Sequence, residues 1–271
     1  MKIVGIHGIG NYRPGELPET AARNLSAAWS KHLGAEAEVV YFADLLREQG
    51  GQSDDASDLE DLTETEEEIV HELLAAQPAA TDPGRVSQGL LTAVLRDGIA
   101  ELAESWACPE WLMEWFMVRF VKEVAAYQRS GPARDAVQQR LREALDRHQP
   151  DVLIAHSLGS VVAYETLHHD GTPPLPLWVT VGSPLALPKA IFNQLNPSPE
   201  AGRGARPPQV ARWTNLADPG DPVAIPAKGV SRRFVGVDSD EHHVVHRGFK
   251  FHHAESYLKS AGLANVLATA S

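Results

Sequence analysis

Segments with two different hydrophobic periods alternate at both ends of this chain. Apolar runs with strand character cover residues 2–7, 37–42, 152–156, 177–181, 210–216 and 233–237, and helical spacing covers residues 18–33, 159–168, 187–195 and 253–267. A strand, a helix and a further strand in succession predict a parallel pair joined by a right-handed crossover. We therefore predict an α/β protein with a doubly wound, mostly parallel sheet of about six strands.

A long segment without a convincing strand interrupts this alternation. We predict that residues 1–43 and 149–271 form the α/β core and that residues 44–148 form a helical insertion, placed as a cap or lid. Three helices are expected within it, at residues 84–104, 109–129 and 132–147. The acidic segment 54–68 is typical of a solvated loop that leads into a helix.

Charge and cysteine content exclude several classes of protein. The 271 residues carry a formal net charge of −12, which disfavours nucleic acid and anionic membrane surfaces as partners. No uncharged apolar run is long enough to span a bilayer, and the N-terminus lacks the pattern of a secretory signal. The single cysteine, Cys108, fits a reducing compartment. We expect a cytoplasmic protein without an integral membrane segment or a nucleic-acid partner.

The apolar run VLIAHSLGS, residues 152–160, stops abruptly at Ser157. Small residues stand two positions before and two positions after this serine, at Ala155 and Gly159. Between a strand and a helix, this pattern is typical of a strained turn that exposes a nucleophile at the carboxyl end of a sheet. The structural alternative is a strand that merely ends in a Ser-Gly turn. We interpret Ser157 as a nucleophile.

A glycine-rich stretch, His7-Gly-Ile-Gly10, follows the first predicted strand. A serine that attacks a carbonyl group needs backbone N–H donors for the developing oxyanion, one of them from such a loop. The amides of Ile9 and Leu158 are the candidates. A dinucleotide site is the alternative, but the glycine order is G-x-x-G-x-G and a turn-rich segment follows where a helix should begin. We predict no cofactor.

Candidates for an acid and a base follow the serine along the chain. Asp218 and Asp221 come after the predicted strand 210–216. Asp221 is preferred because it begins the Asp-Pro-Val arrangement that commonly carries the acid, and Asp218 would then brace the turn. His252 and His253 both stand at the start of the last helix, and either could be the base. We favour His252 and keep both as candidates.

A metal site is the competing interpretation of the histidines between the last predicted strand and helix. His242, His243 and His246 lie near three carboxylates, Asp238, Asp240 and Glu241. The order does not match the H-E-x-x-H pattern, and no cysteine completes a ligand set. We predict no metal and expect these histidines to be exposed loop residues.

These features together resemble the α/β-hydrolase family, in particular the lipase-like branch whose proteins open with His-Gly-Ile-Gly. The matching stretches are residues 7–11, 155–159, 181–185, 215–223 and 252–258, and the resemblance covers residues 1–43 and 150–262. It implies hydrolysis of an ester, thioester or amide in a small-molecule acyl substrate, with Ser157 as the nucleophile. Ala155 stands where the family usually has glycine.

Large aromatic side chains are concentrated in the insertion. Trp111 and Trp115 are four positions apart, as are Leu112 and Phe116, so they share helix faces. These faces either pack the insertion onto the core or, through Trp111, Trp115 and Phe116, line an acyl-binding pocket. We predict a serine hydrolase acting on carboxylic-ester or lipid-type acyl groups. A thioesterase or peptidase using the same residues, and a non-catalytic interaction module, are the alternatives.

Overall fold

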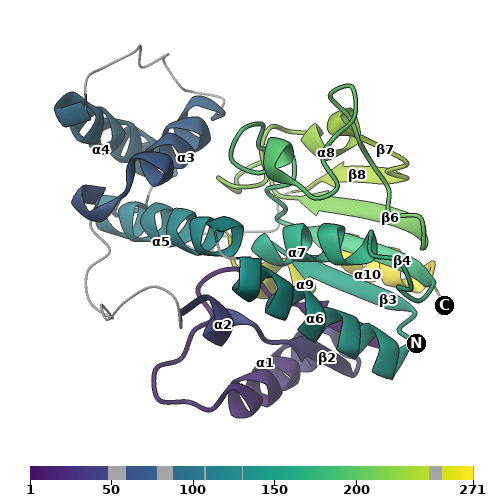
Figure 1. Cartoon of the computed structure of the whole chain (residues 1–271). Coiled ribbons are helices and arrows are strands. Elements are labelled where there is room, and N and C mark those ends of the chain that lie inside the picture. Colours follow the sequence, from purple (N-terminus) through teal and green to yellow (C-terminus); the bar gives the residue numbers. More distant parts are fainter. Residues whose placement is uncertain (48–58, 78–87, 107, 130, 244–251, 271) are drawn as a thin grey trace.

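A parallel sheet of six strands, in the order β2-β1-β3-β4-β6-β8, forms the centre of the structure (Figure 1). The computed structural model describes residues 1–47, 59–77, 88–106, 108–129, 131–243 and 252–270. Every pairing within the sheet is parallel, which confirms the predicted α/β class. The strands are β1 (Ile3–Ile6), β2 (Ala37–Val40), β3 (Val152–His156), β4 (Leu175–Val181), β6 (Val210–Ala217) and β8 (Ser239–His242).

The direction in which the sheet is built reverses between β1 and β3. The chain passes from β1 to its neighbour β2, returns to β3 on the other side of β1, and then continues outward to β8. At such a reversal the connections leave the central strands in opposite directions, and a crevice forms at the carboxyl ends of these strands. The two predicted site segments, which begin at His7 and Ser157, follow β1 and β3 directly.

Helices cover both faces of the sheet. α6 (Gly131–His148) and α7 (Leu158–Leu167) lie in front of it in Figure 1, and α10 (Ala261–Ala268) lies behind it. α1 (Pro18–Leu33) and α9 (Ala254–Leu258) contribute to the same hydrophobic cluster as α10. Leu153 of β3 packs into the cluster on the α7 side, whereas its neighbours Val152 and Ile154 pack on the α10 side. Burial on both faces explains why β3 is a continuous apolar run in the sequence.

Local sequence signals set the limits and the packing of α1. Pro18 stands in its first turn, where the missing N–H has no intrahelical partner, and Gly34 ends the helix with φ +66°. Trp29 of α1 is buried against β1 at Gly5, where a Cβ atom would lie 2.6 Å from the indole ring. The glycine in β1 is therefore required for this helix to approach the sheet.

The described residues between β2 and β3 form helices. The elements before α6 are α2 (Ala43–Arg47), the 3-10 helix η1 (Leu59–Asp61), α3 (Glu64–Ala75), α4 (Gln88–Ser105) and α5 (Glu110–Arg129). α4, α5 and α6 match the three predicted helices. α3, α4 and α5 pack on one another to one side of the sheet (Figure 1). α6 differs from them because it packs on β1, β2 and α7, as one of the helices that cover the sheet.

The acidic segment is less solvated than we predicted. α3 begins within it, and the side chains of Glu66 and Glu67 are buried. Glu66 accepts a hydrogen bond from the Thr63 amide at 2.9 Å and forms an ion pair with Arg129 of α5 at 2.8 Å. The prediction of a solvated segment is wrong at this point, because a capping box and an ion pair offset the cost of burying the carboxylate. Residues 54–58 of the segment lie outside the described residues.

Three predicted elements of the C-terminal part differ in the structure. The predicted helix 187–195 is reduced to a 3-10 helix, η2 (Phe192–Gln194). The predicted strand 233–237 forms β7 (Phe234–Val235), which pairs with β5 (Gly204–Ala205) outside the main sheet. The predicted closing helix is divided into α9 and α10, because the Ser260 side chain caps α10 by accepting a hydrogen bond from the Leu263 amide at 3.1 Å.

The last strand of the sheet, β8, lies where we predicted an exposed loop. Its polar sequence is tolerated at a sheet edge because the buried carboxylate of Asp240 accepts hydrogen bonds from Asn215 Nδ2 at 2.8 Å and from the Ser231 amide at 2.9 Å. His242 is also part of β8, and its side chain is only 11% exposed. The prediction of an exposed loop histidine is therefore wrong for His242.

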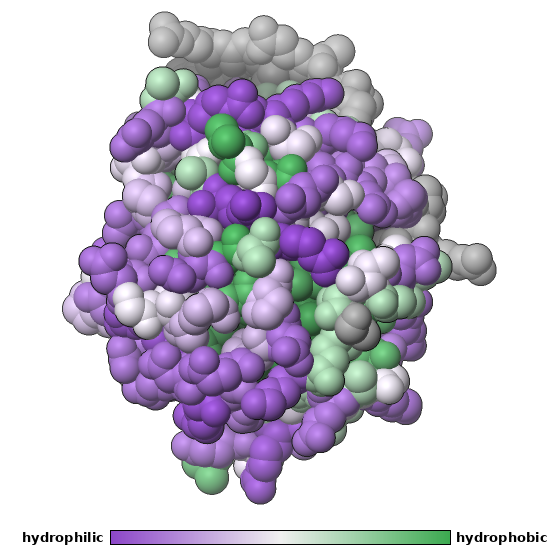
Figure 2. Space-filling view, turned by 90° about the vertical axis from the view of Figure 1, so that its right-hand side faces the viewer, coloured by the Kyte–Doolittle hydropathy of each residue, from purple (hydrophilic) through white to green (hydrophobic). Residues whose placement is uncertain are grey.

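The surface shown in Figure 2 is mainly hydrophilic, and hydrophobic residues form small patches between hydrophilic ones. The described helices include none that is long and apolar enough to cross a membrane. Among the described residues, large hydrophobic side chains are exposed at Met1, Leu17, Trp111, Trp115 and Val235. The two tryptophans lie one helical turn apart on α5.

Candidate active site

Ser157 occupies a strained turn between β3 and α7. Its backbone has φ +54° and ψ −130°, outside the regions that L residues ordinarily adopt. The residues around it must be small, since a Cβ atom at Gly8 would lie 2.3 Å from Ser157 Cβ and one at Gly159 would lie 2.4 Å from the His7 carbonyl oxygen. The loop after β1 and the turn after β3 are therefore in direct backbone contact.

A continuous series of hydrogen bonds joins Ser157, His252 and Asp221. His252 Nε2 lies 2.7 Å from Ser157 Oγ, and His252 Nδ1 lies 2.8 Å from both carboxylate oxygens of Asp221. All three side chains are buried. An ionised carboxylate can only accept, so His252 carries its proton on Nδ1, and Nε2 accepts from the serine hydroxyl. This arrangement can remove a proton from Ser157 and hold it as an imidazolium next to a negative charge.

The structure separates the two candidate histidines. His252 points inward to Ser157, whereas His253 is exposed and lines the pocket described below. His253 is the N-cap of α9, with extended backbone angles, so consecutive side chains point in different directions there. Of the two histidines, His252 is therefore the one whose ring hydrogen-bonds with Ser157 Oγ.

The two candidate aspartates also have different partners. Asp221 is fully buried and, besides His252, accepts hydrogen bonds from the Val223 amide at 3.0 Å and the Tyr257 hydroxyl at 2.8 Å. Asp218 accepts from the Gly220 amide at 2.7 Å and so braces the turn. The structure brings Asp221, and not Asp218, to the histidine.

Two side chains of the glycine-rich loop, those of His7 and Asn11, hold its backbone at Gly8. The Gly8 carbonyl oxygen lies 2.6 Å from His7 Nδ1 and accepts a hydrogen bond from Asn11 Nδ2 at 3.0 Å. In a trans peptide the C=O and the following N–H point in opposite directions, so the Ile9 N–H points away from these two side chains. No hydrogen bond from the Ile9 or Leu158 amide to another described residue is found. Leu158 follows Ser157 directly and Ile9 follows Gly8, which is in close contact with Ser157, so these two amides are the candidate oxyanion donors.

The insertion takes part in holding this loop. Glu123 of α5 accepts a hydrogen bond from the Gly10 amide at 3.0 Å, and the same carboxylate oxygen lies 3.1 Å from Arg119 Nε. Arg119 in turn lies over the Trp115 ring, at 5.5 Å from its centroid. Because Glu123 and Gly10 are 113 positions apart, no local sequence signal indicated this contact. Asn11 lies within the stretch 7–11 that resembles the family, but the sequence pattern does not indicate its hydrogen bond to the Gly8 carbonyl.

His7 is neutral in the folded protein. Its ring is fully buried and stacks on Phe42 at 4.1 Å, and burial lowers the pKa of His7 from 6.5 to about 4. The Phe42 amide donates to Nε2 at 3.0 Å, so the proton is on Nδ1, which donates to the Gly8 carbonyl. A neutral imidazole of this tautomer satisfies both partners.

A pocket of about 380 Å³ opens beside these residues. Its lining comes from the glycine-rich loop, α1, α5 and the start of α9, and it includes His252. Trp115 and Phe116, two of the predicted substrate-binding residues, line it, and the Phe116 ring lies 5.3 Å from His252 in an edge-on arrangement. Trp111 is 70% exposed and is not part of the lining.

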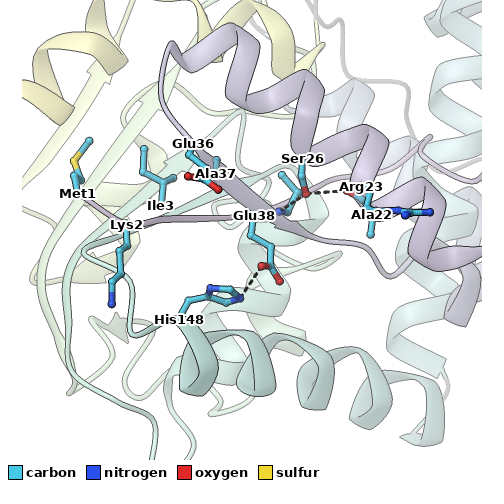
Figure 3. Close-up of a pocket in the computed structure, with 11 residues that line it drawn as sticks. Met1, Lys2, Ile3, Ala22, Arg23, Ser26, Glu36, Ala37, Glu38 and His148 are labelled. Carbon is cyan, nitrogen blue, oxygen red and sulfur yellow. Dashed lines mark hydrogen bonds and ion pairs between the residues drawn. The ribbon is translucent and has the colours of Figure 1, made fainter.

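A second pocket, of about 640 Å³, lies away from this site (Figure 3). It is formed around the start of β1 by residues of α1, β2 and the end of α6, where Glu38 pairs with His148 at 2.7 Å. None of the predicted site residues lines it. The smaller pocket is therefore the one that carries reactive side chains.

The candidate metal ligands do not form a cluster in the described part of the chain. His242 Nε2 accepts from the Lys228 amide at 2.8 Å, and His243 pairs with Glu241 at 3.0 Å. No group of three or more potential ligands is found among the described residues, and His246 lies outside them.

The fold and the site together define an α/β protein with a Ser-His-Asp hydrogen-bond series at the point where the strand order reverses. Comparisons with protein-family models, with curated proteins and with solved structures give no match to this chain.

Proposed function

We propose that this protein is a serine hydrolase of the α/β-hydrolase type, which cleaves a carboxylic ester or a lipid-type acyl bond. The observation that carries the proposal is the hydrogen-bond series from Ser157 through His252 to Asp221. The strained backbone at Ser157 and the glycine-rich loop in contact with it support the same function. A reducing environment suits the single cysteine, and we propose a cytoplasmic enzyme.

In the first half of the proposed reaction, Ser157 becomes acylated. Ser157 Oγ attacks the carbonyl carbon while His252 Nε2 takes the hydroxyl proton. Asp221 stabilises the imidazolium through the Nδ1–H bond, and the amides of Ile9 and Leu158 bind the oxyanion of the tetrahedral intermediate. His252 then gives the proton to the leaving alkoxide oxygen, which departs as an alcohol and leaves an acyl-serine.

Water completes the reaction by the same steps in reverse. His252 takes a proton from a water molecule, whose oxygen attacks the acyl carbonyl carbon. The second tetrahedral intermediate collapses when the C–O bond to Ser157 breaks and the serine oxygen regains its proton from His252. The carboxylic acid leaves and the free enzyme returns.

The pocket lining supports an acyl substrate with an apolar part. Leu112, Trp115 and Phe116 of α5 face the same pocket as His252. We propose that α5 acts as the cap over the reacting group, in addition to holding the glycine-rich loop through Glu123. Thioesters and amides follow the same chemistry and stay as alternatives on the same residues.

Covalent labelling tests the proposed function. The wild-type protein should react stoichiometrically with a fluorophosphonate probe, and Ser157→Ala should not be labelled. Ser105→Ala, which changes an exposed serine at the end of α4, should be labelled like the wild type. If the wild type is not labelled, or if Ser157→Ala is labelled equally, the protein is not a serine hydrolase, and the interaction-module alternative gains support.

A series of p-nitrophenyl esters tests the substrate class. An acyl pocket built from Trp115 and Phe116 predicts that kcat/KM rises with acyl chain length before it falls, because each buried methylene adds about 0.8 kcal/mol of transfer free energy. A flat profile, or a maximum at acetate, would show that these side chains do not bind the acyl chain. In that case they serve only to pack α5.

A further inference from the structure

The Tyr257 side chain contacts Asp221 and comes from α9, the helix that follows His252. It is fully buried on α9, five positions after His252. Its hydroxyl oxygen lies 2.8 Å from Asp221 Oδ2 and 2.9 Å from the Asp218 amide nitrogen. One side chain therefore joins the helix that begins beside His252 to the loop that carries Asp221.

The direction of both hydrogen bonds follows from the chemistry of the partners. A backbone amide can only donate, so the Tyr257 hydroxyl oxygen accepts from Asp218. The hydroxyl hydrogen is then directed to the carboxylate of Asp221, which can only accept. Burial, together with the neighbouring charge of Asp221, raises the pKa of Tyr257 well above 10.0, so the hydroxyl keeps its proton throughout the working range of a hydrolase.

Among the described residues, each carboxylate oxygen of Asp221 has one donor besides His252. Oδ1 accepts from the Val223 amide, Oδ2 accepts from Tyr257, and His252 Nδ1 lies 2.8 Å from both. The side of the carboxylate near Oδ2 is closely packed, since a Cβ atom at Gly182 would lie 2.8 Å from Oδ2 and 2.9 Å from the Tyr257 ring. The carboxylate therefore cannot rotate without losing a buried hydrogen bond.

We propose that Tyr257 is a positioning residue that holds the Asp221 carboxylate in the orientation that receives the His252 Nδ1–H and moderates its negative charge. This inference rests on the proposed function. A hydrogen bond from Tyr257 withdraws charge from the carboxylate, which limits how strongly Asp221 stabilises the imidazolium. Removal of the bond should therefore lower kcat, through loss of orientation, and raise the pKa that governs the acid limb of the pH profile.

Other titratable groups near His252 must stay unchanged in such a test. The His156 ring lies 4.9 Å from the His252 ring, and Asp218 lies beyond Tyr257 on the other side. His253, Glu255 and Arg119 line the same pocket. A substitution at Tyr257 leaves all of these groups in place, so a shift of the acid limb reports on the bond to Asp221.

The Tyr257→Phe variant tests the proposal, with Tyr127→Phe as the matched control. Tyr127 is also fully buried and donates to a buried carboxylate, Glu165, at 2.6 Å, but its hydrogen bonds within the described residues are to Glu165 and Gln138 and not to the Ser157–His252–Asp221 series. Tyr257→Phe should lower kcat about tenfold with little change in KM, and should move the acid limb of kcat/KM up by roughly half a pH unit. Tyr127→Phe should lose stability without either kinetic effect.

Fluorinated tyrosine at position 257 keeps the proposal testable if Tyr257→Phe does not fold. A more acidic phenol is a stronger donor of the same shape, so 3,5-difluorotyrosine should move the acid limb to lower pH, opposite to the phenylalanine variant. If the acid limb does not move with either substitution while the wild type still reacts with the fluorophosphonate probe, Tyr257 has only a structural role. A wild type that does not react would instead contradict the proposed function.

Discussion

His252 Nε2 lies 2.7 Å from Ser157 Oγ, although 95 positions separate the two residues in the sequence. The contact forms because the turn after β3 and the segment before α9 meet at the carboxyl edge of the parallel sheet. Asp221, in the loop after β6, completes the series from the same edge.

Replacement of either neighbouring histidine should identify the base. His252→Gln should reduce kcat by at least about a thousandfold, because the serine proton then has no acceptor. His253→Gln should change kcat less than about threefold, since this side chain is exposed and the hydrogen bond to Ser157 is made by His252. The measurement is steady-state hydrolysis of p-nitrophenyl acetate. Equal losses in the two variants would contradict the assignment of His252.

Gly8→Ala should inactivate the site. The added Cβ atom would lie 2.3 Å from Ser157 Cβ, so the loop, the serine or both must move, and the Ile9 amide would move with them. We expect the rate of fluorophosphonate labelling to fall at least about a hundredfold. Gly131→Ala, at the start of α6, meets no atom within 4 Å and should label at the wild-type rate. A fully active Gly8→Ala variant would exclude the loop as a source of the oxyanion donor.

Loss of the Glu123 carboxylate should slow the reaction although Glu123 belongs to the insertion. Glu123→Ala leaves the Gly10 amide without its acceptor and lets the loop move, so we expect kcat to fall about tenfold. Glu123→Gln keeps a carbonyl acceptor and should recover most of the rate. The measurement is kcat of the two variants and the wild type with the same ester. If alanine and glutamine variants are equally active, α5 does not hold the loop through this bond.

The neutral state of His7 predicts a loss of stability in mild acid. The pKa of His7 is about 4 in the folded protein, whereas an exposed histidine has a pKa of 6.5. Between these two pH values the unfolded chain binds a proton at His7 that the folded chain does not bind. The contribution of neutral His7 to the free energy of unfolding is therefore complete above pH 6.5 and is lost as the pH falls toward 4. The expected loss is about 3 kcal/mol in the free energy of unfolding.

Urea denaturation at pH 7 and near pH 4 measures this effect. In His7→Gln no proton is taken up at this position, so its free energy of unfolding should decline with acid by about 3 kcal/mol less than that of the wild type. Parallel declines for the two proteins would show that His7 is not held neutral.

Much of the fold could be predicted because a strand buried on both faces appears as a continuous apolar run within a short stretch of sequence. The apolar run at β3 and the helical spacing of α1, α5 and α6 each lie within one window of the sequence, and the structure has these elements close to the predicted limits. β8 was missed because its polar residues are stabilised by Asn215 and Ser231, which lie in other parts of the chain. In place of the helix predicted at residues 187–195 the structure has the short 3-10 helix η2, because apolar spacing alone is not sufficient to form a helix.

In the candidate site, too, some features could be predicted from the sequence and others arise only in the tertiary structure. The sequence alone determined which residue types are present and in which order, and it predicted Ser157 at the end of a buried strand and a glycine-rich loop after the first. It could not choose between His252 and His253, because a rotation of one residue exchanges which side chain points inward. Nor could it indicate Glu123 or assign a role to Tyr257, because their partners lie 113 and 36 positions away. Those contacts exist only after the sheet has brought distant loops to one edge, and buried polar groups then find partners by proximity in space.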